Sequence, residues 1–340
     1  MKDKMKAAVF EGTGKLSIKE VNSPRISKDD EMILEIEACS ICGTDVHIMS
    51  VPPGYIATPN TILGHELVGK VIETGKGVMN FKIGDRVVVN PNDYCGTCRY
   101  CLANMPHLCE NVKPMGIDFD GGFAEYVKIT EKVAHRISDG LPTEIAAFAE
   151  PLACVINGTQ KIKAQPGEVV LVIGAGPIGL LFVQFMKAAG ATVICSEPQE
   201  LRREFALKSG ADYAVNPIES DLDAFIKVKY PLGADIVIDV VGSQMSDAIK
   251  VVRKGGKILL FGVNTKAHPQ VVQSQITFKE ISIWGTWLAN ATFPTAVKVL
   301  ESGVLNLQSL VTHTISLDEL QHGIELLRNG EGIEIIVMCK

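Results

Sequence analysis

The chain has 340 residues, of which 46% are hydrophobic and 21% charged, and it carries a formal net charge of −6. This length favours two domains, and the negative charge argues against a nucleic-acid-binding surface. No stretch of about eighteen apolar residues marks a membrane span, and the first residues lack the apolar core of a signal peptide, so we expect a cytoplasmic protein.

Short strands separated by turns are predicted from residue 1 to about residue 137. Residues 31–38 alternate polar and apolar side chains, as a strand does, and the triplet Gly84-Asp85-Arg86 opens an apolar run at 87–89. Residues 142–162 then have a helical pattern.

From residue 168 to about residue 285 the pattern alternates between strand and helix. The predicted strands are 169–173, 192–195, 213–215, 236–241, 257–261 and 281–284. Strands joined by helices in this way indicate a doubly wound parallel sheet, so the fold class is α/β. The rest of the chain predicts helices near 295–302 and 318–328 and a last strand at 334–338.

Four cysteines within fifteen residues, Cys95, Cys98, Cys101 and Cys109, form the arrangement C-x2-C-x2-C-x7-C. Four thiolates on one short loop can close a tetrahedral zinc site without an open position, which makes the site structural. Disulfides fit less well, because nine cysteines are an odd number and a chain of this length does not need them. The last gap also differs from the spacing of iron–sulfur proteins.

A glycine-rich turn, Gly174-Ala-Gly176-Pro177-Ile178-Gly179, follows the predicted strand 169–173 and precedes an apolar helix. The first glycine permits a tight turn, the second lets a pyrophosphate approach the backbone, and the third lets helix and strand pack closely. The helix N-terminus then faces the phosphates. We predict that these residues bind a dinucleotide.

Glu197 lies at the end of the next predicted strand. A carboxylate there accepts hydrogen bonds from the ribose hydroxyls and repels a 2′-phosphate, so we predict NAD as the cofactor. Arg202 and Arg203 follow, and an arginine at this site can accommodate the phosphate, which keeps NADP as the alternative. We include Arg202 among the cofactor-binding residues.

A second group of metal ligands, Cys42, His65 and Glu66, lies upstream. Three protein ligands leave one position for water or substrate, as a catalytic zinc requires. Each residue alone has a simpler interpretation, such as a small buried hydrophobe for Cys42 or a core histidine for His65. Beside the thiolate loop and the nucleotide motif, the group indicates a catalytic site, and hence two zinc ions per chain.

The chain resembles the zinc-dependent medium-chain alcohol and polyol dehydrogenases along nearly its whole length. The segments that carry the resemblance are Cys-Gly-Thr-Asp-Val-His at 42–47, Gly-His-Glu at 64–66, Gly-Asp-Arg-Val at 84–87, the four-cysteine loop, Gly-Gly-Phe-Ala-Glu-Tyr at 121–126, Glu-Pro-Leu at 150–152, and the glycine turn at 174–179. By this resemblance Cys42, His65 and Glu66 hold the catalytic zinc. Glu150 is a further zinc ligand or a carboxylate that acts through the bound water.

The resemblance also implies the domain organisation. Residues 1–155 and 291–340 would form a mostly β, GroES-like catalytic domain that binds zinc. Residues 156–290 would form a Rossmann domain that binds NAD, with the active site in the cleft between the two domains.

These parts imply the oxidation of an alcohol, in which zinc lowers the pKa of the substrate hydroxyl and a hydride passes to the nicotinamide. Thr44 would pass the proton through the nicotinamide ribose towards His47 and solvent. The simpler alternatives are a strand-end hydroxyl for Thr44 and a surface histidine for His47.

The substrate is indicated by the C-terminal residues from 291 to the end of the sequence, which look most like the sorbitol dehydrogenase branch. That branch presents an arginine and a tyrosine where this chain has Leu288 and Ala289, and often an aromatic residue at Ile48, so sorbitol itself is disfavoured. We predict the NAD-dependent oxidation of a secondary alcohol, a polyol or cyclic polyol, to a ketone. The predicted partners are the alcohol substrate and further copies of the chain in a homo-oligomer, a tetramer or dimer. L-threonine 3-dehydrogenase, a general secondary-alcohol dehydrogenase and a catalytically silent nucleotide sensor are the alternatives.

Overall fold

The computed structural model describes residues 1–339 and divides the chain into two compact units. Unit 1 comprises Met1–Ala153, Ala289–Gly303 and the residues from Val311 onwards, and unit 2 comprises Cys154–Leu288 and Val304–Leu310. The resemblance predicts that all of 291–340 belongs to the catalytic domain, whereas the structure groups Val304–Leu310 with unit 2. Part of the reason is a hydrogen bond from Gln184 Nε2 to the Asn306 carbonyl, at 3.0 Å.

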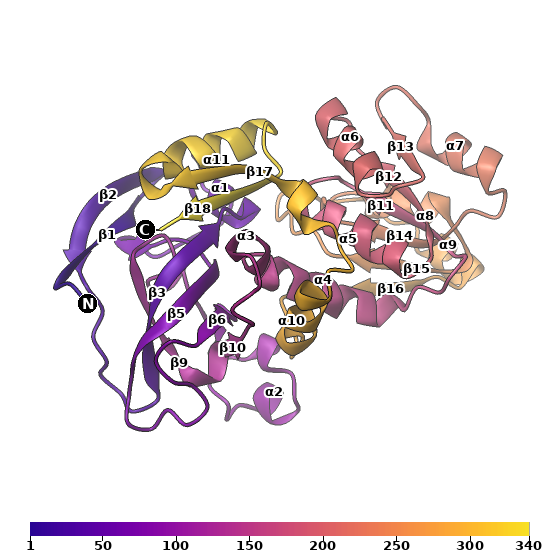
Figure 1. Cartoon of the computed structure of the whole chain (residues 1–340). Helices are drawn as coiled ribbons and strands as arrows, with labels where there is room; N and C mark the ends of the chain where they lie inside the picture. Colours follow the sequence, from indigo (N-terminus) through magenta and orange to yellow (C-terminus); the bar gives the residue numbers. More distant parts are fainter. Residues whose placement is uncertain (340) are drawn as a thin grey trace. The chain divides into compact units, whose positions relative to one another are not determined.

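Unit 1 is built mainly from strands. They are β1 (Lys4–Gly12), β2 (Lys15–Asn22), β3 (Glu31–Ser40), β4 (Thr61–Ile62), β5 (Glu66–Thr74), β6 (Arg86–Val89), β7 (Asn92–Asp93), β8 (Lys113–Pro114), β9 (Tyr126–Thr130), β10 (Ala134–Arg136), β17 (Val311–Ser316) and β18 (Glu334–Met338). The largest sheet has the order β10-β6-β5-β3-β18-β17, with β9 also paired to β3. Strand β18, from the end of the chain, therefore lies beside β3, as Figure 1 shows in yellow and indigo.

Short helices connect these strands. They are α1 (Gly43–Ile48), α2 (Arg99–Leu102), α3 (Thr143–Ala146), α10 (Phe293–Ser302), α11 (Leu320–Asn329), and the 3-10 turns η1 (Pro106–Leu108), η2 (Glu131–Val133) and η4 (Leu317–Glu319). Helix α4 (Ala149–Ile162) begins in unit 1 and continues into unit 2. The helix predicted at 142–162 is thus two helices, interrupted at the buried residues Ala147 and Phe148.

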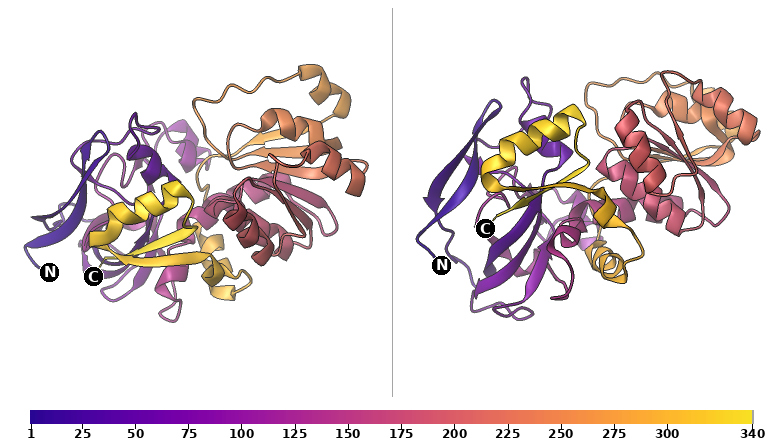
Figure 2. Two further views of the ribbon diagram at one scale, coloured as in Figure 1. Left: turned by 90° about the horizontal axis from the view of Figure 1, so that it is seen from above. Right: turned by 45° about the horizontal axis from the view of Figure 1, so that its top comes forward.

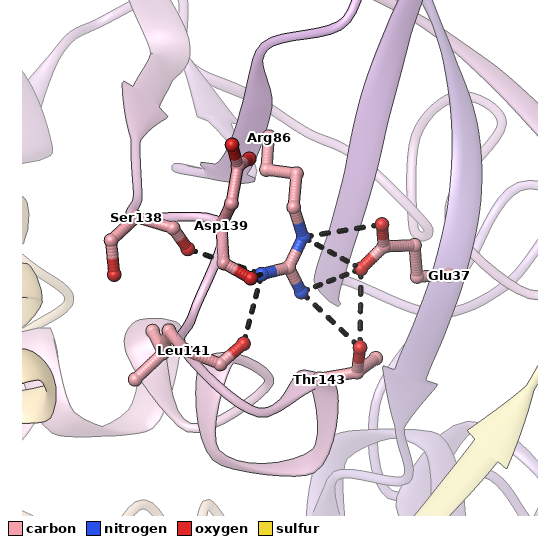
Figure 3. A network of polar contacts seen from close by, with 6 residues as sticks. All are labelled: Glu37, Arg86, Ser138, Asp139, Leu141 and Thr143. Atoms are coloured by element: carbon pink, nitrogen blue, oxygen red, sulfur yellow. Dashed lines mark hydrogen bonds and ion pairs between the residues drawn. The ribbon is translucent and has the colours of Figure 1, made fainter.

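Arg86 fixes the segment that leads into α3 and α4. Its guanidinium forms an ion pair with Glu37 on β3, with Nη2 and Oε2 2.7 Å apart. The same guanidinium donates to the carbonyls of Ser138, Asp139 and Leu141 at 2.8–3.1 Å (Figure 3). Only 8% of Arg86 is exposed, and these hydrogen bonds to neighbouring residues satisfy its buried N–H donors.

Unit 2 contains one six-stranded parallel sheet. Its strands are β11 (Val169–Ile173), β12 (Thr192–Ser196), β13 (Tyr213–Val215), β14 (Ala234–Asp239), β15 (Val252–Leu260) and β16 (Ser282–Gly285). They lie in the order β13-β12-β11-β14-β15-β16, all parallel. The order reverses between β11 and β14, and the carboxyl ends of strands at such a switch point are where open α/β sheets bind ligands.

Helices lie on both faces of this sheet (Figure 2). They are α5 (Pro177–Ala188), α6 (Glu200–Lys208), α7 (Leu222–Lys229), α8 (Met245–Val251) and α9 (Gln273–Lys279), with the 3-10 turn η3 (Leu307–Leu310). All five residues of β11 are buried, as expected of a central strand covered on both faces. The predicted α/β fold class is confirmed. None of the helices in residues 1–339 combines the length and the apolar character needed to cross a membrane.

Candidate functional site

Cys42, His65 and Glu66 come together at one end of the large sheet in unit 1. Their ligand atoms all lie within 4.8 Å of one another. Cys42 is the N-cap of α1, two residues after the end of β3, and Glu66 begins β5. Ser40 on β3 pairs with Glu66 on β5, so the sheet register brings the three ligands to the same place.

The electrostatics of this group are set by burial and by carboxylates. His65 and Glu66 are 7% and 4% exposed, and burial raises the pKa of the Cys42 thiol and of the Glu66 carboxyl. Burial also lowers the pKa of His65, but the charges of Asp45, Glu66 and Glu150 together raise it.

Asp45 supports the group from behind. It is fully buried, its Oδ2 accepts from the Cys42 backbone N–H at 2.9 Å, and its Oδ1 lies 3.9 Å from His65 Nδ1. The last distance is too long for a hydrogen bond, and within residues 1–339 neither of these two atoms has a hydrogen-bond partner. A carboxylate behind a ligating histidine is a common outer partner in metal sites.

The donor set fits a zinc ion. Sulfur, imidazole nitrogen and carboxylate oxygen are the ligands that zinc takes in proteins, and three of them leave a position open. A thiolate and a carboxylate buried this closely are costly unless a cation lies between them. An ion would reverse the pKa shift of Cys42, because a coordinating thiol is deprotonated.

The other predicted catalytic residues lie on neighbouring elements. Glu150 is buried in the first turn of α4, and its charge raises the pKa of both Cys42 and His65. Glu150 does not belong to the group of residues whose ligand atoms lie within 4.8 Å of one another, so its role as a direct ligand stays a prediction. Thr44 is half-buried and His47 is exposed, both on α1.

The four-cysteine loop forms a second group of sulfur atoms. Its shortest Sγ–Sγ distances, from Cys95 to Cys109 and from Cys98 to Cys101, are 3.5 and 3.6 Å, and the pairs Cys98–Cys109 and Cys95–Cys101 are 3.9 and 4.0 Å apart. A disulfide needs about 2.05 Å, whereas a tetrahedron with zinc–sulfur bonds of about 2.3 Å has edges of about 3.8 Å. The distances fit a closed zinc site and exclude disulfides within the loop.

Backbone N–H groups point at these sulfur atoms. Those of Thr97 and Cys98 donate to Cys95 Sγ at 3.5 and 3.3 Å and, with the Thr97 hydroxyl, lower the pKa of Cys95 to about 5. Asn111 donates in the same way to Cys109 Sγ, at 3.3 Å. These donors favour the thiolate of Cys95, which is the form that binds metal, whereas burial raises the pKa of Cys101 to about 12.

In unit 2 the glycine turn lies at the carboxyl end of β11, next to the switch point. Gly174 has a φ of +101°, and a Cβ on Gly179 would lie 2.0 Å from the Gly174 carbonyl oxygen, so both positions require glycine. A Cβ on Gly176 would meet nothing within 4 Å, which leaves open space beside the turn. Pro177 and Ile178 form the first turn of α5, both half-buried.

Glu197 follows β12 and faces the same turn. Its carboxylate accepts from the Ala175 N–H at 2.8 Å and from the Gln199 N–H at 3.0 Å, and it is 4% exposed. Arg203 donates to the carbonyls of Glu197 and Pro198. Within residues 1–339 the half-buried Arg202 Nε has no hydrogen-bond partner.

Three residues that shape the sites were not predicted from the sequence. Asp239, at the end of β14, accepts from the backbone of Val241, Gly242 and Gln244 and so orders the loop beside the glycine turn. The signal available was an acidic residue at the end of a buried parallel strand. Ser40 and Glu334 lie behind Glu66, and here the signal was a charged residue opening the apolar run 334–338.

Comparison with known proteins matches both units to described families. Residues 28–139 match the family model of the alcohol dehydrogenase GroES-like domain. Residues 177–302 match the model named zinc-binding dehydrogenase.

Similar proteins span nearly the whole chain. An L-threonine 3-dehydrogenase of Caldanaerobacter subterraneus subsp. tengcongensis is 36% identical over 92% of each chain. D-arabinitol dehydrogenase 1 of Uromyces fabae is 34% identical, covering 98% of this chain and 97% of its own.

Solved structures of the same architecture carry either nicotinamide dinucleotide. A zinc-binding dehydrogenase of Sinorhizobium meliloti 1021 bound to NADP superposes with a TM-score of 0.93 at 32% identity, over 99% of this chain and 100% of that one. An alcohol dehydrogenase of Escherichia coli CFT073 complexed with NADH also has a TM-score of 0.93, at 30% identity and with the same coverage.

Proposed function

Because this chain belongs to the zinc-binding dehydrogenases of the alcohol dehydrogenase family, we propose that it oxidises a secondary alcohol, a polyol or cyclic polyol, to a ketone with NAD. Membership of this family makes the protein an NAD(P)-dependent oxidoreductase that uses zinc and acts on a small molecule. The single observation that supports the catalytic part is the grouping of Cys42, His65 and Glu66 within 4.8 Å.

The proposed site assigns Cys42, His65 and Glu66 to a catalytic zinc and the four-cysteine loop to a structural one. When bound, zinc and the dinucleotide supply a Lewis acid for the hydroxyl oxygen and an acceptor for the hydride. Asp45 holds the backbone of Cys42 in place through the 2.9 Å hydrogen bond to Oδ2.

The chain supplies the two ends of the proposed proton route, Thr44 and His47, and the nicotinamide ribose would lie between them. Thr44 is half-buried in the first turn of α1, and the exposed His47 lies three residues further along, on the same side of the helix. In the proposed route the Thr44 hydroxyl receives the substrate proton, and His47 releases it to solvent.

The polyol assignment is supported by the charges around the site. Burial raises the pKa of Cys42 most, and the carboxylates of Glu66, Asp45 and Glu150 raise it further. A carboxylate such as Glu150 can accept a hydrogen bond from a second hydroxyl of a polyol, and a deoxy analogue would lose that hydrogen bond. The arabinitol dehydrogenase relative is named for such a substrate.

L-threonine is the second candidate, because a relative with 36% identity is named for it. In that case Glu150 would pair with the substrate ammonium group instead of a hydroxyl. Steady-state NAD reduction with polyols, cyclic polyols, L-threonine and aliphatic secondary alcohols separates the candidates.

The proposed function predicts that a polyol is the best substrate and that a deoxy analogue loses about 100-fold or more in kcat/KM, which is more than one methylene group usually costs. Cys42→Ala is the control that removes turnover. If simple aliphatic alcohols react as well as any polyol, the protein is a general alcohol dehydrogenase. Binding of NAD without turnover of any alcohol would support the nucleotide-sensor alternative.

We also propose that the protein works in the cytoplasm as a homo-oligomer, a dimer or tetramer. None of the nine cysteines, all of which lie within residues 1–339, forms a disulfide, which favours a reducing compartment. Light scattering coupled to size-exclusion chromatography gives the mass of the assembly, and a mass of one chain would reject the oligomer.

A further inference from the structure

Three residues from distant parts of the chain meet behind the metal group, on adjacent strands of the large sheet. Ser40 on β3 lies opposite Glu66 on β5 and opposite Ile336 on β18. Glu334 is two residues before Ile336, so its side chain is on the same face of the sheet as that of Ser40. The Ser40 hydroxyl donates a hydrogen bond to Glu66 Oε2 and also contacts the Glu334 carboxyl.

Both carboxyl groups are almost completely buried. Ser40, Glu66 and Glu334 are 0%, 4% and 2% exposed. Within residues 1–339, Glu334 Oε1 has no hydrogen-bond partner. Burial is the largest cause that raises the pKa of Glu334, and the charge of Glu66 raises it further.

The charges near the metal group disfavour a further carboxylate at Glu334, because Asp45 and Glu150 already add negative charge there. The Cys42 thiolate and the Glu66 carboxylate already balance one divalent cation. Within residues 1–339 an ionised Glu334 would be a buried negative charge without an ion-pair partner, and an unpaired buried charge is unfavourable in proteins. A neutral carboxylic acid has an O–H group to donate, and the Ser40 oxygen is its neighbour.

We propose that Glu334, as a neutral acid, donates a hydrogen bond to Ser40, and that Ser40 in turn donates to Oε2 of the metal ligand Glu66. The chain Glu334–Ser40–Glu66 has one direction, because the Ser40 hydroxyl has a single proton and that proton points to Glu66. Glu334 is therefore a positioning residue that acts through Ser40. This inference rests on the proposed assignment of Cys42, His65 and Glu66 as ligands of the catalytic zinc.

The arrangement holds Glu66 in one orientation. One carboxylate oxygen is occupied by Ser40, and the other is left for the metal. Outer partners of this kind fix the direction of a ligand, and their loss typically weakens metal binding by about 10- to 100-fold.

The test follows zinc in the holoprotein of three variants: Glu334→Leu, Ser40→Ala and Glu334→Gln. Zinc release to a chromophoric chelator reports retention, and the visible absorption after exchange to Co²⁺ reports the geometry of the ligands without needing activity. The four-cysteine loop provides an internal control, because its metal should be released at the same rate in every variant. Thermal melting identifies any variant that does not fold.

We expect Glu334→Leu and Ser40→Ala each to release the catalytic zinc about 10- to 100-fold faster and to change the Co²⁺ spectrum. The double variant should be no worse than either single variant, because both remove the same hydrogen-bonded chain. Glu334→Gln should behave like the wild type, since its amide N–H can donate to Ser40.

Two results overturn the inference. Zinc retention and a Co²⁺ spectrum unchanged in Ser40→Ala or in a folded Glu334→Leu would show that Glu66 does not need this support. A Glu334→Gln variant as defective as Glu334→Leu would show that Glu334 does not act as a neutral donor. If Cys42→Ser keeps both zinc ions, the proposed ligand set itself is wrong, which is a separate outcome.

Discussion

At the scale of single residues, Glu197 connects cofactor choice to the shape of the glycine turn. Its carboxylate accepts from the backbone N–H groups of Ala175 and Gln199, so it holds the turn and places a negative charge beside it. That charge is what would repel a 2′-phosphate, and the neighbouring Arg203 is already engaged with backbone carbonyls. Arg202, whose Nε lacks a partner within residues 1–339, is the remaining cation that could favour NADP.

We expect Glu197→Ala to raise the KM for NAD about tenfold and to narrow the preference for NAD over NADP, because the ribose contact and the phosphate repulsion are both lost. Steady-state kinetics with each dinucleotide measures this. Glu197→Gln is the matched control: it removes the charge but keeps an acceptor for the Ala175 N–H, so it should mainly improve the use of NADP. A wild-type protein that prefers NADP would contradict this role of Glu197.

At the scale of elements, the packing between distant segments decides where the proposed catalytic residues lie. Arg86 at the start of β6 joins β3 to the segment before α3, and α4 then presents Glu150. In a different part of unit 1, His135 on β10 stacks on Phe293 at the start of α10, with ring centroids 4.9 Å apart and an angle of 11°. Both contacts bury polar groups, so both make the stability of unit 1 sensitive to single changes.

Replacing Arg86 with Leu should destabilise unit 1 by about 3 kcal/mol or more, because Glu37 would keep its charge in a largely buried place without its partner. Thermal or urea unfolding followed by circular dichroism measures the change. In the double variant Arg86→Leu/Glu37→Leu, part of the loss should be recovered. Equal stability of the wild type and Arg86→Leu would rule out a structural role for the ion pair.

Burial lowers the pKa of His135 to about 4, well below the ordinary value of about 6.5. Between these two values the unfolded chain binds a proton at this position and the folded chain does not, so acid favours unfolding. The contribution of His135 to stability should therefore be complete above about pH 7 and should decline as the pH falls from about 6.5 to 4.

Melting temperatures of the wild type and of His135→Phe between pH 4.5 and 8 test this expectation. The variant keeps an aromatic ring against Phe293 but has no titrating group, so its melting temperature should fall less towards acid pH. Parallel curves would show that another group causes the acid sensitivity.

At the scale of the whole molecule, the two proposed metal sites differ in how they relate to folding. The four-cysteine loop is local in sequence and its sulfur atoms form a closed set, so a metal bound there would contribute to the free energy of folding. The Cys42 group assembles only when β3 and β5 are already paired, so its metal is bound by a structure that exists without it.

We expect metal analysis to find about two zinc ions per chain, as a closed structural site and an open catalytic site together require. Cys98→Ala should lower soluble yield and melting temperature, whereas Cys42→Ala should abolish turnover and leave a folded protein with one zinc ion. Circular dichroism and elemental analysis of both variants measure these outcomes. Fully active protein with a single zinc ion would be decisive evidence against two sites.

Several features were predictable from the sequence alone because they depend on neighbours along the chain. The spacing of Cys95, Cys98, Cys101 and Cys109 places four sulfur atoms on one loop in any fold that keeps the loop. The turn at 174–179 is equally local, and in the structure Gly174 has the positive φ, and Gly179 the close backbone contact, that require glycine. Apolar runs such as 169–173 predict buried parallel strands, and the structure has β11 at those residues.

Only the tertiary structure decided which distant residues meet. Strand register places Ser40 opposite Glu66 and brings Glu334 in from the far end of the chain, and a shift of one residue would turn these side chains to the other face. The grouping of 304–310 with unit 2 and the contact of Arg86 with Glu37 are decided in the same way, by packing between segments far apart in sequence. Local spacing therefore determined the identity of the metal-binding and nucleotide-binding motifs, whereas the surroundings that tune them follow from sheet pairing, which no short stretch of sequence encodes.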